Sequence, residues 1–76
     1  MKLNDKERKE LIVLRYPYIA RDKDGGLWMH EEEPQKKGDI WDGDFGMSRS
    51  LDEKGFKDIR WEDEKATLTE DLLKEE

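Results

Sequence analysis

The sequence predicts an α+β fold, a small antiparallel β-sheet of three to four strands with a short N-terminal helix and an optional short C-terminal helix. Three observations predict it. A charged, helix-favouring segment precedes a short apolar run at the N-terminus, and a turn rich in Asp and Gly joins two β-type segments. Seven aromatic residues are spread over positions 16–61, and large rings of this kind supply an apolar core.

The N-terminal helix is expected to run to about residue 14. Asn4 or Asp5 can cap it, because their side-chain oxygens accept from free amides of the first turn. Pro17 ends it, since proline lacks an amide donor. The residues near one helical face are Leu3, Glu7, Leu11 and Leu14. The apolar run 11–14 also fits the start of a strand, and this alternative stays open.

A β-hairpin is the clearest local signal in the chain. Residues 18–21 and 27–31 flank a turn at 22–26, where Asp-Gly and Gly-Gly supply the positive-φ positions that hairpin turns need. Alternation separates Tyr18 and Ala20 from Ile19 and Arg21, and separates Leu27 and Met29 from Trp28 and His30. Pro34 stops the second strand, and residues 35–38 are predicted to form a turn.

The second half of the chain gives weaker signals. Residues 39–42 predict a third strand, and after a turn at 43–44 residues 45–48 are expected to continue the sheet. Ser50 and Glu53 fit a capping box, so 51–54 are predicted to form one helical turn closed by Gly55. Residues 56–61 predict a last extended segment. A terminal helix capped by Thr67 or Thr69 would use Leu68, Leu72 and Leu73, and it persists only if those leucines dock.

The core is expected to be aromatic. Because Trp28 shares a face with His30, and Tyr18 shares one with Ala20, at least one aromatic ring should face outward. An exposed Trp28 beside the acidic run 31–33 would be a plausible binding hot spot. The predicted core residues are Leu11, Leu14, Tyr18, Leu27, Trp28, Trp41, Phe45, Phe56, Ile59 and Trp61.

The net charge of −6 is unevenly distributed. Residues 1–61 carry a net charge of −1 and are predicted to form a single small α+β domain. Residues 62–76 carry −5 and form an acidic C-terminal segment, either flexible or a docked helix. The sequence therefore separates a nearly neutral domain from an acidic end.

Several functional classes are disfavoured. The chain has no cysteine for disulfides or thiolate zinc sites, and no apolar run near the ~20 residues that cross a bilayer. No signal-peptide pattern or phosphate-binding glycine motif is present, so we expect a cytoplasmic, non-enzymatic protein without cofactors or membrane contact. His30, the single histidine, is expected at the surface or a sheet edge.

Calcium is the one metal to weigh, because Asp-x-Asp spacing occurs twice. The loop from Asp22 places Glu33 at position 12 but Leu27 where an EF-hand requires glycine. Asp42, Asp44 and Glu53 match positions 1, 3 and 12 of an EF-hand loop. Met47 stands where that loop requires glycine for its sharp turn. No metal site is therefore predicted.

The acidic residues suggest a partner. Basic residues are interleaved with acidic ones, so direct nucleic-acid binding is not expected. Carboxylates can instead be presented to a basic host protein much as phosphates are, or they can simply solvate a small protein. The candidate partner-binding residues are Trp28, Glu31, Glu32, Glu33, Asp39, Asp42, Asp44, Glu62, Asp63 and Glu64.

The chain also resembles a family. An Ala-Arg-Asp-x-Asp-Gly-x-Leu-Trp hairpin at 20–28, then an acid-Pro segment, a lone Trp41 and a closing Trp-Glu-Asp-Glu at 61–64 resemble small accessory proteins of phages and prophages of Gram-positive bacteria. The resemblance covers about residues 16–64. The family has no established activity, so no catalytic residue is carried over.

That resemblance implies action inside an infected bacterial cell. By analogy with small acidic phage proteins, it suggests an inhibitor of a host nucleic-acid-processing or defence protein, like anti-CRISPR proteins or nuclease inhibitors. The alternative is a structural or assembly accessory that self-associates through its apolar tail. Both a monomer and a weak homodimer remain open.

Overall fold

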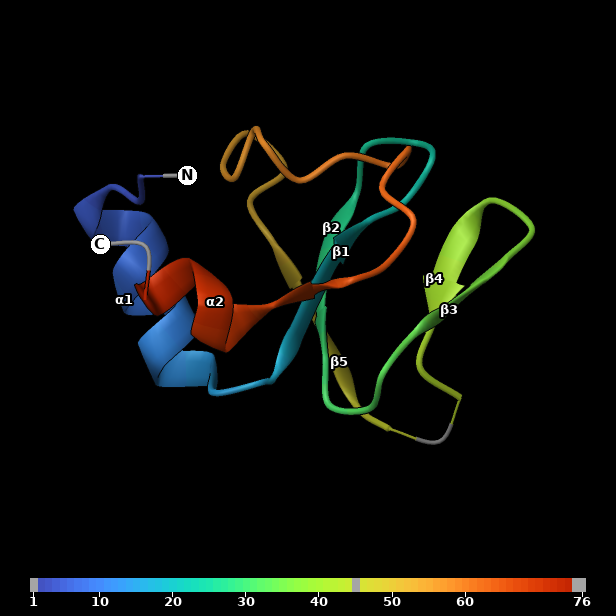
Figure 1. The fold of residues 1–76 in the computed structure, drawn as a ribbon, viewed down its shortest axis with the longest axis horizontal. Helices are drawn as coiled ribbons and strands as arrows, with labels where there is room; N and C mark the ends of the chain where they lie inside the picture. The colour runs from blue at the N-terminus through green and yellow to red at the C-terminus, as the bar shows by residue number, and fades with distance from the viewer. Residues whose placement is uncertain (1, 45, 75–76) are drawn as a thin grey trace.

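The chain folds into two helices and two antiparallel sheets, in a computed structural model that describes residues 2–44 and 46–74. The elements are α1 (Asp5–Leu14), β1 (Tyr18–Arg21), β2 (Leu27–His30), β3 (Gln35–Lys37), β4 (Ile40–Asp42), β5 (Ser48–Leu51), β6 (Thr67–Leu68) and α2 (Thr69–Lys74). The four-stranded sheet has the order β5-β2-β1-β6, and β3 pairs with β4. The predicted α+β class is confirmed. In Figure 1 the helices lie on one side of the larger sheet, and β3 and β4 lie on the other.

Helix α1 begins with a capping box. The Asn4 side chain accepts a hydrogen bond from the Glu7 amide at 2.8 Å, and the Glu7 side chain accepts one from the Asn4 amide at 2.9 Å. The helix ends at Arg15, whose left-handed conformation (φ 57°) directs its amide to the Leu11 carbonyl. The predicted helix to residue 14 is confirmed, and the alternative strand from Leu11 is wrong.

The predicted hairpin is also confirmed. Tyr18 pairs with His30 and Arg21 with Leu27, and the Asp22 amide donates to the Gly26 carbonyl at 2.8 Å. Gly25 adopts a φ of 97°, which only glycine adopts without strain. Local turn chemistry therefore sets the register of the central strand pair.

Three local predictions are wrong. Residues 35–38 are not merely a turn, because Gln35–Lys37 form β3 and pair with β4. The helical turn at 51–54 is absent, since β5 runs to Leu51 and pairs with β2. Residues 56–61 form turns, and the last strand is Thr67–Leu68.

The core lies on one face of the larger sheet and is mainly aliphatic. Ile19 and Met29 are fully buried there, whereas Trp28, assigned to the core from sequence, is 36% exposed. The buried cluster contains Leu3, Leu11, Ile19, Leu27, Met29, Phe56, Ile59 and Leu72. Trp41 is buried outside this cluster, Leu14, Tyr18 and Trp61 are half-buried, and the predicted core residue Phe45 lies outside the described residues.

The C-terminal residues contribute to this core. Strand β6 pairs with β1, and the Thr69 amide donates to the Pro17 carbonyl at 2.9 Å. Leu72 of α2 is 5% exposed, and Leu73 packs against the cluster. Leu72 and Leu73 of the acidic segment thus complete an undersized core, whereas Leu68 stays exposed.

Arg21 holds the irregular segment between β5 and β6. Its Nε donates to the Ile59 carbonyl at 2.7 Å, and Nη2 donates to the Gly55 and Phe56 carbonyls at 2.8 and 3.1 Å. Nη1 donates to the Gly25 and Glu53 carbonyls at 2.8 and 3.0 Å. A guanidinium has five N–H donors, and each here matches one backbone carbonyl.

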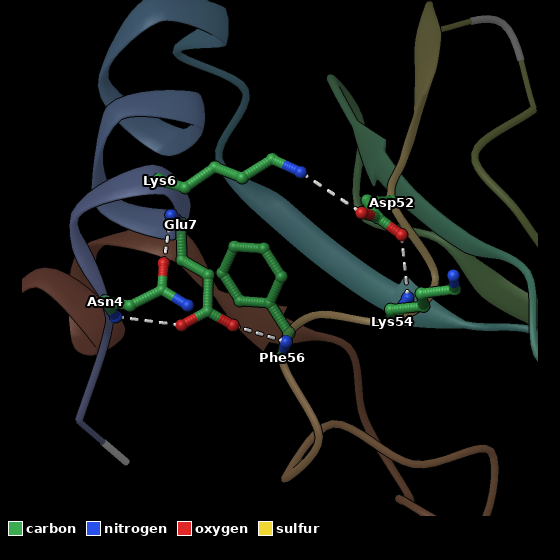
Figure 2. Close-up of polar contacts among 6 residues, drawn as sticks. All are labelled: Asn4, Lys6, Glu7, Asp52, Lys54 and Phe56. Atoms are coloured by element: carbon green, nitrogen blue, oxygen red, sulfur yellow. Dashed lines mark hydrogen bonds and ion pairs between the residues drawn. The ribbon is translucent and has the colours of Figure 1, made fainter.

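Glu7 holds the same segment from the helix side. Its second carboxylate oxygen accepts from the Phe56 amide at 2.6 Å, as Figure 2 shows together with the Asn4 contact. Nearby, Lys6 donates to Asp52 at 3.1 Å. Phe56 has a φ of 53°, unusual for a residue with a side chain, and this contact helps to hold it.

We predict that Arg21→Lys lowers the free energy of unfolding by about 3 kcal/mol, because lysine has three donors and leaves at least two carbonyls unpaired. Urea unfolding measures the change. Arg49→Lys is the matched control, since Arg49 is exposed, and it should stay within about 0.5 kcal/mol of the parent. Equal effects of the two substitutions would contradict the role given to Arg21.

Candidate interaction surface

Two clefts meet at Trp41 on the face opposite the aliphatic core. The first has a volume of about 380 Å³, and its lining includes Trp28, His30, Trp41, Asp42, Asp44 and Ser48. The second has a volume of about 260 Å³ and is lined by Glu33, Pro34, Gln35, Trp41, Glu64, Lys65 and Ala66. Trp41 thus forms a wall of both clefts.

Asp22 fixes Trp41 in this position. It follows β1 directly, is 8% exposed, and its Oδ1 accepts a hydrogen bond from the Trp41 amide at 2.8 Å. Beside it the Lys23 amide donates to the Asp39 carbonyl at 3.1 Å. Burial raises the pKa of Asp22, and the Trp41 amide opposes that rise. One side-chain and one backbone hydrogen bond therefore attach the β3–β4 hairpin to the β1–β2 turn.

His30 lies on the inner strand β2 and is 5% exposed, so the expected position at the surface or a sheet edge is wrong. The chain at Gly43 passes over it, and a Cβ on Gly43 would lie 3.4 Å from His30 Nδ1. Burial lowers the pKa of His30, while the carboxylates of Asp22 and Asp42 raise it by a smaller amount.

Two buried polar atoms, on residues that line the first cleft, lack partners. His30 Nε2 and Trp41 Nε1 make no hydrogen bond within residues 2–44 and 46–74. An unpaired buried polar group costs about 1–3 kcal/mol, and natural proteins keep such groups mainly where they serve a purpose. Both residues with an unpaired atom, His30 and Trp41, line the cleft that also contains Trp28.

Three candidate residues from the sequence line the first cleft, namely Trp28, Asp42 and Asp44. Lys37 pairs with Asp44 and lies 3.8 Å from Asp42, so their charges are partly balanced. Asp39 is outside the cleft and pairs with Lys23 at 3.7 Å. Trp28 is therefore the exposed apolar part of a cleft with partly paired carboxylates.

The two acidic runs meet at the second cleft through Glu33 and Glu64. Glu32 lies against the following loop, because a Cβ on Gly46 would come within 2.9 Å of its backbone nitrogen. Glu31 and Glu62 are exposed, whereas Asp63 is half-buried and accepts from the Arg60 amide at 3.1 Å. Among the described residues, the carboxylates without an ion pair include those of Glu31, Glu32, Glu33, Glu62 and Glu64.

Sequence reasoning missed the aromatic support of this surface. Lys36 Nζ lies 4.5 Å from the ring centroid of Trp61 and 5.2 Å from that of Trp41. The two rings meet edge to face, with centroids 6.4 Å apart. Such cation–π contacts are worth about 0.5–1 kcal/mol at exposed sites. These contacts were missed because Lys36 lies in β3, and a strand that contains no apolar residue has the sequence pattern of a turn.

The Asp-x-Asp spacing at 42–44 has a structural use. Asp42 Oδ1 accepts from the Asp44 amide at 2.7 Å, which stabilises the turn after β4. Within the described chain, no three His, Cys, Asp or Glu residues are grouped so as to hold a metal ion. Neither α1 nor α2 is long and apolar enough to cross a membrane.

Comparison with protein-family models, curated proteins and solved structures finds no match to the chain. The resemblance to phage accessory proteins therefore stays a prediction, and the arguments about function rest on the geometry of the clefts.

We predict that the free energy of unfolding falls as the pH is lowered from about 7.5 to about 5.5. The folded pKa of His30 lies below 6.5, so the unfolded chain takes up a proton here more readily than the folded chain. Asp22 contributes with the opposite sign. Its pKa is higher in the folded state, so its protonation stabilises the fold as the pH falls, but only at pH values just above 3.8. Urea unfolding at both pH values measures the net change.

The control for this prediction is His30→Gln, which removes the titrating group from the cleft. The variant should lose most of the pH dependence over the same range, whatever its absolute stability. If it loses stability on acidification as much as the parent does, another group is responsible.

Proposed function

We propose that the protein is a non-enzymatic interaction protein that binds a basic protein through the surface around Trp41. The observation that carries this proposal is the convergence of Glu33 and Glu64 at one cleft, with Trp41 as its wall. These carboxylates come from runs 31 residues apart, and they have no ion-pair partner among the described residues. A basic partner would supply the missing counter-charges.

The neighbouring cleft adds apolar contact area. Trp28 keeps 36% of its surface exposed beside Asp42 and Asp44. Tryptophan anchors in partly desolvated surroundings dominate many protein interfaces. The combination of an exposed ring and surrounding carboxylates suits an arginine or lysine side chain, which has an apolar stem and a charged end.

The proposal extends to inhibition of a host nucleic-acid-processing or defence protein in the cytoplasm of a bacterial cell. Carboxylates spaced along an acidic surface can occupy the basic groove that would otherwise bind phosphates. A net charge of −6 also accelerates encounter with such a groove at low ionic strength. Direct binding of nucleic acid by this chain is disfavoured for the same reason.

Absence of catalysis is part of the proposal. A serine or threonine nucleophile is activated by a neighbouring base, and in the described residues His30 Nε2 makes no hydrogen bond to a hydroxyl. The alternative of self-association through the tail loses its expected basis, because Leu72 is buried in its own core. A self-association surface would instead use Ile12, Val13 and Leu68, which are 50%, 67% and 41% exposed.

The test begins with affinity capture from a bacterial lysate at low ionic strength, followed by calorimetry with the purified captured protein. Glu33→Lys with Glu64→Lys should weaken binding at least about tenfold, and binding should fall steeply as salt is raised. Inhibition is tested on the captured protein's own activity.

The matched control is Glu53→Lys with Asp71→Lys, which changes the net charge equally at exposed residues outside both clefts. This pair should leave affinity within about threefold of the parent. If both double variants lower the affinity equally, net charge alone explains the effect, and the proposed surface is contradicted.

A further inference from the structure

Strand β5 has an outer edge that pairs with no other strand of the described residues. It pairs with β2 on one side only and is the first strand of the sheet order. The opposite edge strand, β6, has two residues, whereas β5 has four. Ser48, Arg49 and Ser50 are all exposed, and β5 contains no proline. An open edge of this kind is a template for another strand.

The register shows which backbone groups face outward. The Glu31 amide donates to the Met47 carbonyl at 2.9 Å, and these residues continue the β2–β5 pairing that joins His30 to Ser48. Hydrogen-bonded and non-hydrogen-bonded pairs alternate in an antiparallel ladder. Ser48 and Ser50 therefore occupy the non-hydrogen-bonded positions, so their N–H and C=O groups point away from β2.

The same residues adjoin the first cleft. Ser50 is paired with Trp28 and Ser48 with His30, so their side chains lie on the face that carries Trp28 and His30. Ser48 itself lines the cleft with Asp42 and Asp44. A strand added along β5 would place every second side chain on this face, beside the carboxylates.

A second copy of this chain is a poor occupant. Pairing two β5 strands through Ser48 and Ser50 of each copy would place Arg49 directly opposite Arg49 of the other copy, at a non-hydrogen-bonded position where side chains are closest. Like charges directly opposite one another destabilise a sheet. The edge thus favours a different chain.

We propose that β5 receives an extended segment of a basic partner protein as an additional antiparallel strand. Arginine or lysine would lie opposite Ser48 and Ser50, above the cleft, and an acidic or neutral residue would lie opposite Arg49. Backbone hydrogen bonds supply affinity in this mode, and alternate side chains supply specificity. The inference rests on the proposed basic partner and specifies how part of that partner is held.

The probe is a synthetic peptide in which arginine and threonine alternate, compared with a peptide of the same composition in which the arginines form one block. Calorimetry measures affinity, and NMR measures amide exchange at Ser48 and Ser50. The alternating peptide should bind at least about tenfold more tightly and protect both amides. Binding without such protection would overturn strand addition.

The variant test is Ser50→Pro, which removes an amide that makes no hydrogen bond to β2. It should weaken the alternating peptide about tenfold, whereas Ser50→Ala keeps the amide and should bind normally. Thermal unfolding checks that both variants fold. If Ser50→Pro does not fold, protection of the Ser48 and Ser50 amides by the alternating peptide in the parent protein decides whether a strand is added.

The outcomes separate this inference from the proposed function. If both peptides bind equally and the Glu33→Lys with Glu64→Lys variant weakens both, the basic-partner proposal holds and strand addition is wrong. If neither peptide binds at low salt, both proposals fail. A dimer of the parent protein that Ser50→Pro disperses would assign the edge to a second copy and overturn the inference.

Discussion

The five hydrogen bonds of Arg21 are the constraint on which the rest of the structure depends. The segment after β5 forms no strand, so its carbonyls need another partner, and Arg21 supplies it to four of them, from Glu53 to Ile59. Through Gly25 the same guanidinium also holds the β1–β2 turn. Because this segment supplies Phe56 and Ile59 to the core, a single side chain connects the hairpin turn to the aliphatic cluster. A chain of this length without disulfides depends on such connections.

This arrangement separates two kinds of surface. One face of the larger sheet is occupied by aliphatic residues, α1 and α2, and the β3–β4 hairpin, which contains Trp41, lies on the other side (Figure 1). Asp22, the next residue after Arg21, anchors that hairpin through the Trp41 amide. Two adjacent residues therefore have separate roles: Arg21 holds the segment between β5 and β6, and Asp22 holds the candidate surface. The two acidic runs meet at Trp41 because Glu33 and Glu64 both line the cleft that Trp41 borders.

The features predicted from sequence are those with local causes. The Asn4 cap, the Gly25 turn and the leucines of α2 each act within a few residues, and the helices and hairpin follow from them. The face of the sheet that forms the core was not predicted. Alternation allows either the face with Tyr18 and Trp28 or the face with Ile19 and Met29 to be buried. Only the packing of α1 and the 52–60 segment selects the second face. The candidate acidic residues were named from composition and position. Their meeting at Trp41, the lysines that balance some of them and the burial of His30 depend on long-range contacts with no local signal.

The most direct test of the acidic surface is zero-length carbodiimide cross-linking of the purified protein to its captured basic partner, with mass-spectrometric assignment of the linked carboxylates. The account predicts cross-links from Glu31, Glu33 and Glu64 to partner lysines, because these carboxylates have no ion-pair partner in the described residues. Cross-links confined to Asp5 of α1 and Asp71 of α2, with none around Trp41, would contradict it.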